Sequence, residues 1–258
     1  MKKPLKDKKL FIFDMDGTIY LGNRVFPFAV EFIKKLRADG KKVLFFTNNA
    51  SKNPEVYLDR LTKMGFEPSR EEIMTAGDVT VRFLLTERPG KRVFLLGTPM
   101  LAESFEKAGI TLSDEADIVV TSFDTTLTYE KLEKACTLIR NGAEYLCTHP
   151  DFNCPTETGF IPDSGAIAAA VTASTGVRPR FFGKPYKDTA EMILSYTGCK
   201  AKEACIFGDR LYTDIALGKN SGIYAVLVLT GETVLSDLRN CPDEQKPDLV
   251  IESIKNLL

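Results

Sequence analysis

The chain has 258 residues, of which 44% are hydrophobic and 27% are charged, so it is long enough for one large domain or two modest ones. Its 34 basic and 35 acidic side chains give a formal net charge of −1, which offers no electrostatic reason to expect a nucleic-acid polymer or an anionic membrane as partner. No stretch approaches the roughly 20 apolar residues that cross a bilayer, and the basic start leads into only "LFIF", which is too short for a secretory signal.

The cysteines and the single histidine do not form a metal-binding motif. The six cysteines contain no Cys-x-x-Cys pair, and His149 has no set of partners at ligand spacing. Scattered cysteines in a chain of this length are more typical of small buried side chains than of disulfides. We therefore expect a cytoplasmic protein without a zinc site.

The N-terminal part of the chain alternates between predicted strands and helices. "KLFIF" is a strand candidate, and residues 26–41 follow as a helix with one apolar face that ends at Gly40. "KVLFFTNN" repeats the strand pattern, and "PEVYLDRLTKMG" supplies a helix between Pro54 and Gly65. "EEIMTAG" is a weaker strand before a helix over residues 78–86. This alternation predicts an α/β fold with a parallel sheet flanked by helices.

An interruption at residues 87–93 divides the pattern, because Pro89 and Gly90 break both periodicities. A second alternating block runs from "RVFLLG" to "SGAIAAAVTASTG", and from Phe181 the first pattern resumes with "FFGKP", "ACIFGD" and "YAVLVLTG". We infer one α/β domain that is split in the sequence, formed by residues 1–79 and 182–258, with a second α/β domain inserted at residues 80–181.

Polar residues follow four predicted strands of the split domain. They are Asp14 with Asp16, Thr47 with Asn48, Lys184, and Asp209 with Asp214. Open parallel sheets bind ligands beyond the carboxyl ends of their strands, so we expect these side chains to share one site. Several carboxylates in one crevice repel each other unless a cation is present, and hard oxygen ligands favour Mg²⁺. A lysine and a hydroxyl beside such an ion would form a cradle for a phosphate group.

The residue types also restrict the chemistry of this predicted site. One histidine in the whole chain, and no serine-histidine pairing, argue against a histidine general base. A carboxylate nucleophile that forms an aspartyl-phosphate is the remaining economical choice.

In the order "DMDGT", "TNN", "GKP" and "GDRLYTD", these residues resemble the four motifs of the haloacid dehalogenase superfamily of phosphatases. The interval between Thr47 and Lys184 is where C2-type caps occur in that superfamily. "TNNAS" and "FGKP" are similar to the branch that contains the NagD-like nucleotide phosphatases and the 4-nitrophenyl, phosphoglycolate and pyridoxal phosphate phosphatases. The resemblance covers essentially the whole chain and implies a Rossmann-like core with an inserted α/β C2-type cap.

The resemblance implies a role for each residue that matches a motif. Asp14 would attack phosphorus, and Asp16 would protonate the leaving oxygen and later activate the hydrolytic water. Lys184 would neutralise charge between the phosphate and the nucleophile. Thr47 and the backbone amide of Asn48 would hold phosphate oxygens.

The resemblance also implies a set of metal ligands. Asp14, the backbone carbonyl of Asp16 and Asp209 would bind Mg²⁺, while Asp214 would orient Lys184 or the waters on the metal. Asp214 could instead be the N-cap of the helix in "IALGKN".

Other matched residues also have structural alternatives. Thr47 could cap the helix that follows it, and Lys184 could be one more solvated lysine. Gly17 and Gly208 are interpreted as residues that the backbone requires beside the site, without contact to substrate.

The inserted domain contains a polar segment, "CTHPDFNCPTETGFIPDSG", that could help to select the substrate. In the resembling branch the start of this segment commonly reads Thr-Asn-x-Asp, and here His149 replaces the asparagine. A structural role for His149 is favoured over substrate contact, and for Asp151 the two interpretations are balanced. Asp163 stands where relatives often have glycine, and it adds a negative charge or caps the next helix.

We therefore expect a Mg²⁺-dependent phosphatase that hydrolyses small phosphomonoesters through an aspartyl-phosphate on Asp14. A phosphotransferase or mutase with the same intermediate is the alternative, although the caps of known mutases lie between the first two motifs. A non-catalytic phosphate-binding module is a third interpretation, against which the intact Asp14 and Asp16 argue. Caps of this branch sometimes dimerise, so a homodimer through the cap is left open. The sequence does not indicate which phosphomonoester is the substrate.

Overall fold

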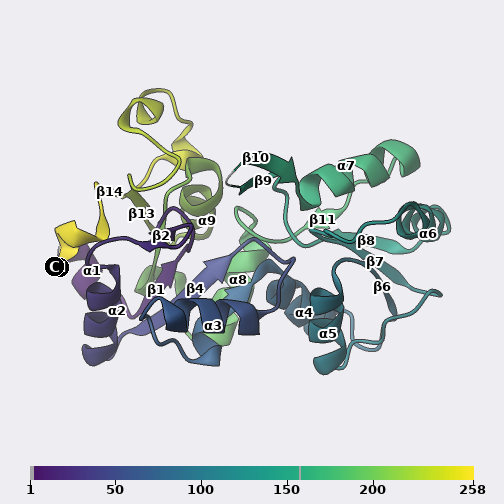
Figure 1. Ribbon diagram of the computed structural model, residues 1–258, viewed down its shortest axis with the longest axis horizontal. Coiled ribbons are helices and arrows are strands. Elements are labelled where there is room, and N and C mark those ends of the chain that lie inside the picture. The colour runs from purple at the N-terminus through teal and green to yellow at the C-terminus, as the bar shows by residue number, and fades with distance from the viewer. Residues whose placement is uncertain (1–2, 157) are drawn as a thin grey trace. The chain divides into compact units, whose positions relative to one another are not determined.

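The chain forms two compact units in the computed structural model, which describes residues 3–156 and 158–258. The first unit comprises the described residues up to Thr47, together with Pro54–Met74 and Lys184–Leu258. The second comprises Asn48–Asn53 and Thr75–Gly183. In Figure 1 the first unit contains the purple to blue and the light green to yellow parts of the chain, and the second unit is mostly teal. One unit is therefore built from both ends of the chain, with the middle of the chain in the other.

The first unit is built on a six-stranded sheet with the order β14-β13-β12-β1-β4-β5. Each neighbouring pair from β14 to β4 is parallel. This finding confirms the predicted α/β fold with a parallel core sheet. The strands are β1 (Leu10–Phe13), β4 (Lys42–Thr47), β5 (Ile73–Thr75), β12 (Ala204–Gly208), β13 (Tyr224–Val228) and β14 (Leu249–Ile251).

Helices connect these strands, as expected for parallel pairs that cannot be joined by tight turns. On α2 the side chains of Phe32, Ile33 and Leu36 recur at helical spacing and are buried. The helices of the first unit are α1 (Lys3–Lys6), α2 (Ala29–Ala38), α3 (Pro54–Lys63), α8 (Lys187–Thr197) and α9 (Ala216–Ser221). The short helical turns are η1 (Arg70–Glu72), η2 (Ala201–Glu203), η3 (Leu211–Ile215), η4 (Leu235–Arg239), η5 (Asp243–Gln245) and η6 (Ile254–Leu257). A small antiparallel hairpin is formed by β2 (Tyr20–Leu21) and β3 (Arg24–Val25).

An aromatic cluster fills the core beneath the two central strands. The rings of Phe13 and Phe207 stack with their centroids 4.8 Å apart, and Phe32 of α2 meets Phe13 edge to face at 6.3 Å. Every residue of β1 and β12 is buried, which explains why their sequences are continuous apolar runs without alternation. The cluster fixes the central strands that carry the polar residues at their ends.

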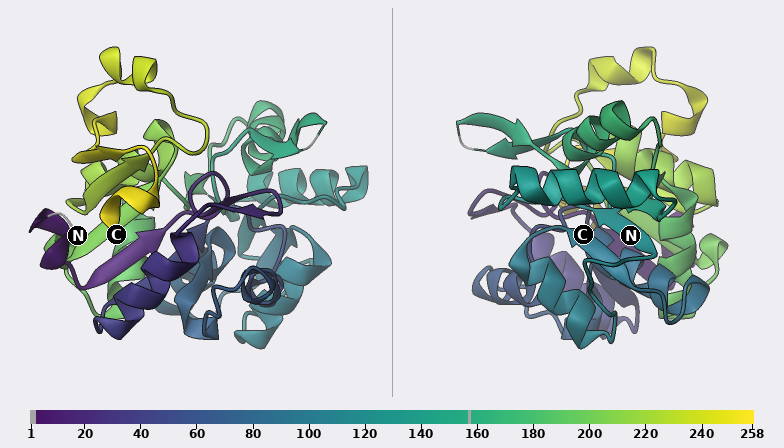
Figure 2. Two further views of the ribbon diagram at one scale, coloured as in Figure 1. Left: turned by 60° about the vertical axis from the view of Figure 1, so that its left-hand side comes forward. Right: turned by 90° about the vertical axis from the view of Figure 1, so that its right-hand side faces the viewer.

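The second unit has its own parallel sheet of four strands with the order β11-β8-β7-β6. The strands are β6 (Val93–Leu96), β7 (Ile118–Thr121), β8 (Glu144–Cys147) and β11 (Arg180–Phe181). The helices are α4 (Ala76–Glu87), α5 (Pro99–Lys107), α6 (Tyr129–Arg140) and α7 (Ser164–Thr175). An exposed antiparallel hairpin of β9 (Asn153–Thr156) and β10 (Gly159–Pro162) projects from this unit, as Figure 2 shows.

The helices found in the described part of the chain are not transmembrane segments. Within residues 3–156 and 158–258, no helix combines the length and the apolar character that a membrane span requires.

We predict that Phe207→Ala lowers the free energy of unfolding of the first unit by about 3–5 kcal/mol, because it removes the central ring of the aromatic cluster and leaves a cavity. Urea denaturation followed by circular dichroism measures this loss. Leu235→Ala is the matched control, because Leu235 is 64% exposed and its truncation should change the free energy by less than about 0.5 kcal/mol. Equal losses in the two variants would contradict the assignment of the core.

Candidate active site

The register of the central strands brings several polar residues to the same edge of the first unit's sheet. Phe13 at the end of β1 pairs with Phe207 of β12 on one side and Phe45 of β4 on the other. Asp14 therefore leaves β1 at the level where β12 reaches Gly208, and Asp209 follows directly. Because all three strands are parallel, their carboxyl ends open into one crevice.

Three carboxylates and one ammonium group meet at this edge. Asp14, Asp209 and Asp214 each place a carboxylate oxygen within 4.8 Å of the others. Lys184 Nζ lies 2.5 Å from Asp14 Oδ1 and 2.7 Å from Asp214 Oδ1. The ring centroid of Phe46 lies 5.5 Å from the same nitrogen. Residues from three separate parts of the chain thus form one compact charged cluster.

Asp209, Asp214 and Lys184 are buried and Asp14 is half-buried, and burial disfavours the ionised carboxylates. Desolvation and the charges of Asp214 and Asp209 raise the pKa of Asp14 to about 7, although the charge of Lys184 acts in the opposite direction. Desolvation and the charge of Asp214 raise the pKa of Asp209 to about 6. Burial also disfavours the ammonium of Lys184, but the charges of Asp14 and Asp214 outweigh it and raise its pKa. One ammonium therefore does not balance three neighbouring carboxylates.

The surroundings of Asp209 fit a hard divalent cation. Its Oδ2 accepts a hydrogen bond of 2.7 Å from the N–H of Glu232, whereas Oδ1 is buried and has no hydrogen-bond partner within residues 3–156 and 158–258. A Cβ on Gly17 would lie 2.5 Å from Asp209 Oδ2, and one on Gly231 would lie 2.0 Å from it, so both positions require glycine. An orphaned carboxylate oxygen beside two further carboxylates is a donor set that a cation such as Mg²⁺ would satisfy.

Asp214 and Lys184 do not follow the structural alternatives considered from the sequence. Asp214 Oδ2 accepts hydrogen bonds from the N–H of Arg210 at 3.3 Å and from the Thr213 hydroxyl at 3.2 Å. The N-cap of α9 is Ile215, so Asp214 does not cap that helix. Lys184 is only 3% exposed and is therefore not a solvated surface lysine. Gly208 is pressed against this pair, since a Cβ there would lie 2.1 Å from Asp214 Cβ.

Asp16 lies two residues after Asp14 and is exposed. Desolvation raises its pKa above the usual range, while the charges of Arg60 and Arg210 oppose the shift. Arg60 stacks on the ring of Tyr20 at 4.6 Å and donates a hydrogen bond of 2.6 Å to the carbonyl of Gly22. A carboxyl whose pKa is raised retains a proton closer to neutral pH, which is a requirement for a general acid.

In the sequence, Thr47 is the last residue of the first segment of the first unit, and Asn48 is the first residue of the second unit. Thr47 ends β4, and because α3 begins only at Pro54, Thr47 is not the cap of that helix. Asn48 begins the short segment that belongs to the second unit, where its Nδ2 donates a hydrogen bond of 3.2 Å to Asp151 Oδ2. Gly183 packs against this asparagine, because a Cβ there would lie 2.8 Å from Asn48 Oδ1.

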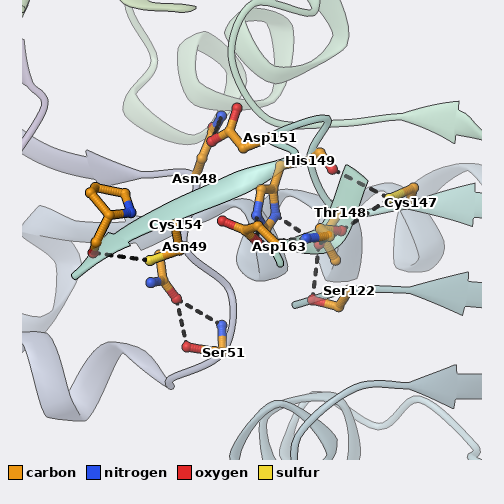
Figure 3. Close-up of polar contacts among 12 residues, drawn as sticks. Asn48, Asn49, Ser51, Ser122, Cys147, Thr148, His149, Asp151, Cys154 and Asp163 are labelled. Carbon is orange, nitrogen blue, oxygen red and sulfur yellow. Dashed lines mark hydrogen bonds and ion pairs between the residues drawn. The ribbon is translucent and has the colours of Figure 1, made fainter. Parts of the chain in front are cut away.

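His149 and Asp163 form a buried pair in the second unit, shown in Figure 3. His149 Nε2 lies 2.8 Å from Asp163 Oδ1, and Nδ1 lies 3.0 Å from the Thr148 hydroxyl. The same oxygen of Asp163 accepts a hydrogen bond of 2.6 Å from the N–H of Ser164 and so caps α7. His149 is fully buried with both ring nitrogens engaged, so it can influence a substrate only through its neighbours.

Possible metal ligands also lie close together in the second unit, but we do not infer a metal site there. His149, Asp151 and Asp163 place ligand atoms within 4.8 Å of one another. Each of these side chains already has a protein partner, as the dashed lines and contacts in Figure 3 illustrate for His149.

Several residues beside the charged cluster carry no role in the sequence interpretation. Arg60 and Arg210 place positive charge near Asp16, and Gly231 and Glu232 enclose Asp209. A usable signal exists for the second pair, because "YAVLVLTGE" is another apolar run that ends in polar residues. Polar residues that follow a predicted parallel strand are candidates for the site, and this segment also meets that criterion.

Comparison with known proteins adds an independent line of information. A sequence model described as "Haloacid dehalogenase-like hydrolase" matches residues 11–111, and a second model for HAD-like hydrolases matches residues 181–257. The chain is 34% identical to the 5'-nucleotidase YutF of Bacillus subtilis over 97% of both chains. It is 36% identical to an acid sugar phosphatase of Staphylococcus aureus over 92% of both chains.

Solved structures agree in fold over almost the full length. The 4-nitrophenylphosphatase of Thermotoga maritima superposes with a TM-score of 0.94 and 43% identity, covering 99% of this chain and 98% of its own. NagD of E. coli superposes with a TM-score of 0.89 and 28% identity, covering 95% and 96%. The two sheets of this chain therefore have counterparts in structures of both proteins.

We predict that removing one carboxylate relieves repulsion in the metal-free protein. At pH 7.5 with EDTA, Asp209→Asn should have a higher melting temperature than wild type, by about 2–4 °C for each kcal/mol relieved. The pKa of Asp209 is raised from 3.8 to about 6 in the folded state. The folded state therefore takes up a proton at a higher pH than the unfolded state does, and wild type gains stability as the pH falls below about 6. The advantage of the variant should therefore shrink between pH 7.5 and pH 5.

Thermal melts of both proteins across this pH range measure the difference. Saturating Mg²⁺ should raise the melting temperature of wild type and have a much smaller effect on the variant. A stability difference that is independent of pH would contradict the charge imbalance.

Proposed function

The chain belongs to the haloacid dehalogenase-like hydrolases, in the family of NagD and the 4-nitrophenylphosphatases, and on this premise we propose that it hydrolyses small phosphomonoesters through an aspartyl-phosphate on Asp14. It is a phosphatase of that superfamily. The observation that carries the proposal is the cluster of Asp14, Asp209, Asp214 and Lys184, in which Asp14 and Asp209 directly follow the central strands β1 and β12. A buried site with an excess of negative charge is suited to hold a cation together with a phosphate group.

In the first step a carboxylate oxygen of Asp14 attacks phosphorus, and the bond from phosphorus to the leaving oxygen breaks. Asp16 gives its proton to that oxygen, so the product leaves as a neutral alcohol. Lys184 is held beside Asp14 and neutralises part of the charge on the transferring group. The nucleophile and the acid must be different residues, because one carboxyl cannot donate its proton and attack at the same time.

In the second step Asp16, now ionised, takes a proton from a water molecule. The water oxygen attacks phosphorus, and the bond from phosphorus to the Asp14 oxygen breaks. Inorganic phosphate leaves, Asp14 is again a carboxylate and Asp16 is again protonated. The raised pKa of Asp16 suits a group that carries a proton in one half of the cycle and not in the other.

The proposed metal is Mg²⁺, held by Asp14, Asp209 and the backbone carbonyl of Asp16. A bound Mg²⁺ would neutralise charge on the phosphate oxygens and on the carboxylates around it. Asp214 acts through its ion pair with Lys184, whose ammonium it holds at 2.7 Å. A cationic group such as Lys184 that is positioned before the substrate arrives stabilises the charge that develops in a loose phosphoryl-transfer transition state.

Thr47 and the backbone amide of Asn48 are proposed to bind phosphate oxygens. The position of Thr47 at the end of β4, the strand beside β1, supports this role. The side-chain amide of Asn48 donates a hydrogen bond to Asp151, and the proposed phosphate contact is made by its backbone amide.

We also propose that the second unit, which contains residues 80–181, acts as the cap that contacts the leaving group. The related proteins have names that refer to a nucleotide, a sugar phosphate and 4-nitrophenyl phosphate. These molecules share the phosphomonoester and differ beyond it, so selection depends on the cap. Asp151 is the proposed contact residue, and the buried His149 would act by fixing the loop that carries it.

We predict that Asp14→Asn reduces phosphate release by at least about 10⁴-fold while leaving the fold intact, because an amide is not a nucleophile for phosphorus. Release of inorganic phosphate from a panel of phosphomonoesters, with Mg²⁺ and with EDTA, measures the effect. Asp39→Asn is the matched control, because Asp39 lies at the exposed end of α2. Undiminished turnover in Asp14→Asn would refute the mechanism, and transfer to an added alcohol in preference to water would indicate a phosphotransferase.

We predict that Asp151→Asn changes the ranking of substrates more than it changes the phosphate chemistry. The substitution removes a charge next to Asn48, so the ratio of kcat/KM for a nucleoside monophosphate and a sugar phosphate should shift by about fivefold or more. Steady-state kinetics with both substrates measure the ratio, and the exposed Asp114 provides the control Asp114→Asn. An unchanged ratio would remove Asp151 from substrate selection.

A further inference from the structure

We propose that Thr230 is a positioning residue for the metal site, and that the segment Thr230–Thr233 joins the turn after Asp14 to the carboxylate of Asp209. The inference rests on the proposed function, because it assumes that Asp14 and Asp209 share a divalent cation. None of the four sequence motifs includes this segment. It follows β13, the strand that pairs with β12.

The first contact of the segment is to the turn that follows the proposed nucleophile. The hydroxyl of Thr230 donates a hydrogen bond of 2.7 Å to the carbonyl of Gly17. Gly17 has φ 86°, a conformation that only glycine adopts readily, and its N–H donates a hydrogen bond of 2.7 Å to the carbonyl of Tyr20, which holds this turn. The chain before Thr230 is fixed as well, because the N–H of Leu229 donates to the carbonyl of Ile251 at 3.1 Å.

The second contact is to the metal ligand itself. The N–H of Glu232 donates 2.7 Å to Asp209 Oδ2, and the N–H of Thr233 donates 3.2 Å to the carbonyl of Asp209. Gly231 passes so close that a Cβ would lie 2.0 Å from Asp209 Oδ2. The segment therefore restricts the rotation of this carboxylate and leaves its other oxygen, Oδ1, without a hydrogen bond from residues 3–156 and 158–258.

Side chains attach the same segment to the loop after β12. The carboxylate of Glu232 pairs with Arg210 Nε at 2.9 Å and accepts a hydrogen bond of 2.9 Å from the Tyr212 hydroxyl. Arg210 directly follows Asp209 in the sequence, and Tyr212 comes two residues after Arg210. The segment is thus bonded to Asp209, to the residues after it and, through Thr230, to the turn at Gly17.

These contacts give Thr230 a specific physical task. Two carboxylates from distant parts of the chain repel each other, and a cation binds well only if they are held at the right separation before it arrives. Hydrogen-bond partners that orient ligands typically contribute about 10-fold to 100-fold in metal affinity. Within the segment, the Thr230 hydroxyl supplies the side-chain hydrogen bond to the Gly17 turn, so its removal should loosen that separation.

The test is a comparison of three variants in the full-length protein. Thr230→Val keeps the shape of the side chain and removes the hydroxyl. Thr230→Ser keeps a hydroxyl at this position. Thr197→Val is the matched control, because the Thr197 hydroxyl also donates to a backbone carbonyl, that of Ile193 at 2.9 Å, within helix α8. Lys42 Nζ bonds to the carbonyl of Thr197, which places this control at the edge of the sheet where β4 begins.

Isothermal titration of EDTA-treated protein with MgCl₂ measures affinity without turnover. We expect the Kd for Mg²⁺ to rise about tenfold in Thr230→Val and to stay within about threefold of wild type in Thr230→Ser and Thr197→Val. In assays with 4-nitrophenyl phosphate, Thr230→Val should need about tenfold more Mg²⁺ for half-maximal rate, with a nearly unchanged rate at saturating Mg²⁺. If Thr230→Val does not fold, Thr230→Ala takes its place.

A wild-type Kd in Thr230→Val, or an equal loss in Thr197→Val, would overturn the positioning role while leaving the proposed function in place. Failure of Thr230→Ser to restore binding would overturn it as well, because the role belongs to the hydroxyl. Wild-type protein that neither binds Mg²⁺ nor releases phosphate would overturn the proposed function and this inference together.

Discussion

The structure of the first unit depends on one electrostatic constraint, which is that three carboxylates and a single ammonium are confined in a buried space. Desolvation raises the pKa of Asp14 and of Asp209, so the cluster is costly for the metal-free protein at neutral pH. A fold tolerates such a cost when the same arrangement is needed for function. The surrounding features, from the glycines to the hydrogen bonds of Asp209, serve to hold charges that would otherwise separate.

The sheet supplies the rigidity for this arrangement. Parallel strands with aromatic side chains packed beneath them fix the levels at which Asp14 and Asp209 leave the sheet. Close packing then allows little movement, because a single Cβ at Gly17, Gly208 or Gly231 would overlap a site carboxylate. Burial therefore has two effects in the first unit: it stabilises the sheet, and it shifts the pKa values of the carboxylates at the edge of the sheet.

Much of this arrangement could be predicted from the sequence, for a physical reason. Apolar runs that end abruptly in polar residues identify strand ends, and parallel strands bring such ends to one edge, so the convergence of Asp14, Asp209 and Asp214 follows from the pattern. The expectation that Lys184 follows a strand of the split domain is wrong, because the strand before it, β11, pairs with β8 in the sheet of the second unit. Contacts made by backbone groups leave no such pattern. The N–H of Glu232 and the carbonyl of Gly17 are present in every residue, so their partners became evident only in three dimensions.

The pairing of His149 with Asp163 shows the same limit in the second unit. The sequence indicated that both residues differ from those usual in the resembling branch, but it did not indicate that they contact each other. Their ring and carboxylate form a buried pair at the start of α7, so two departures that look independent in the sequence form one local interaction. A residue in such a pair cannot be interpreted, or substituted, without its partner.

The division of the chain into two units has a consequence for how selectivity arises. The charged cluster lies entirely within the first unit, and the pairs of His149 with Asp163 and of Asn48 with Asp151 lie within the second. If the second unit acts as the proposed cap, substitutions in it would change which molecules are accepted without altering the carboxylates of the first unit. The proposed separation would then explain how proteins of one fold can have names that refer to different phosphomonoesters. Chemistry limited by electrostatic geometry stays constant, whereas recognition, which depends on loops and side chains, can vary.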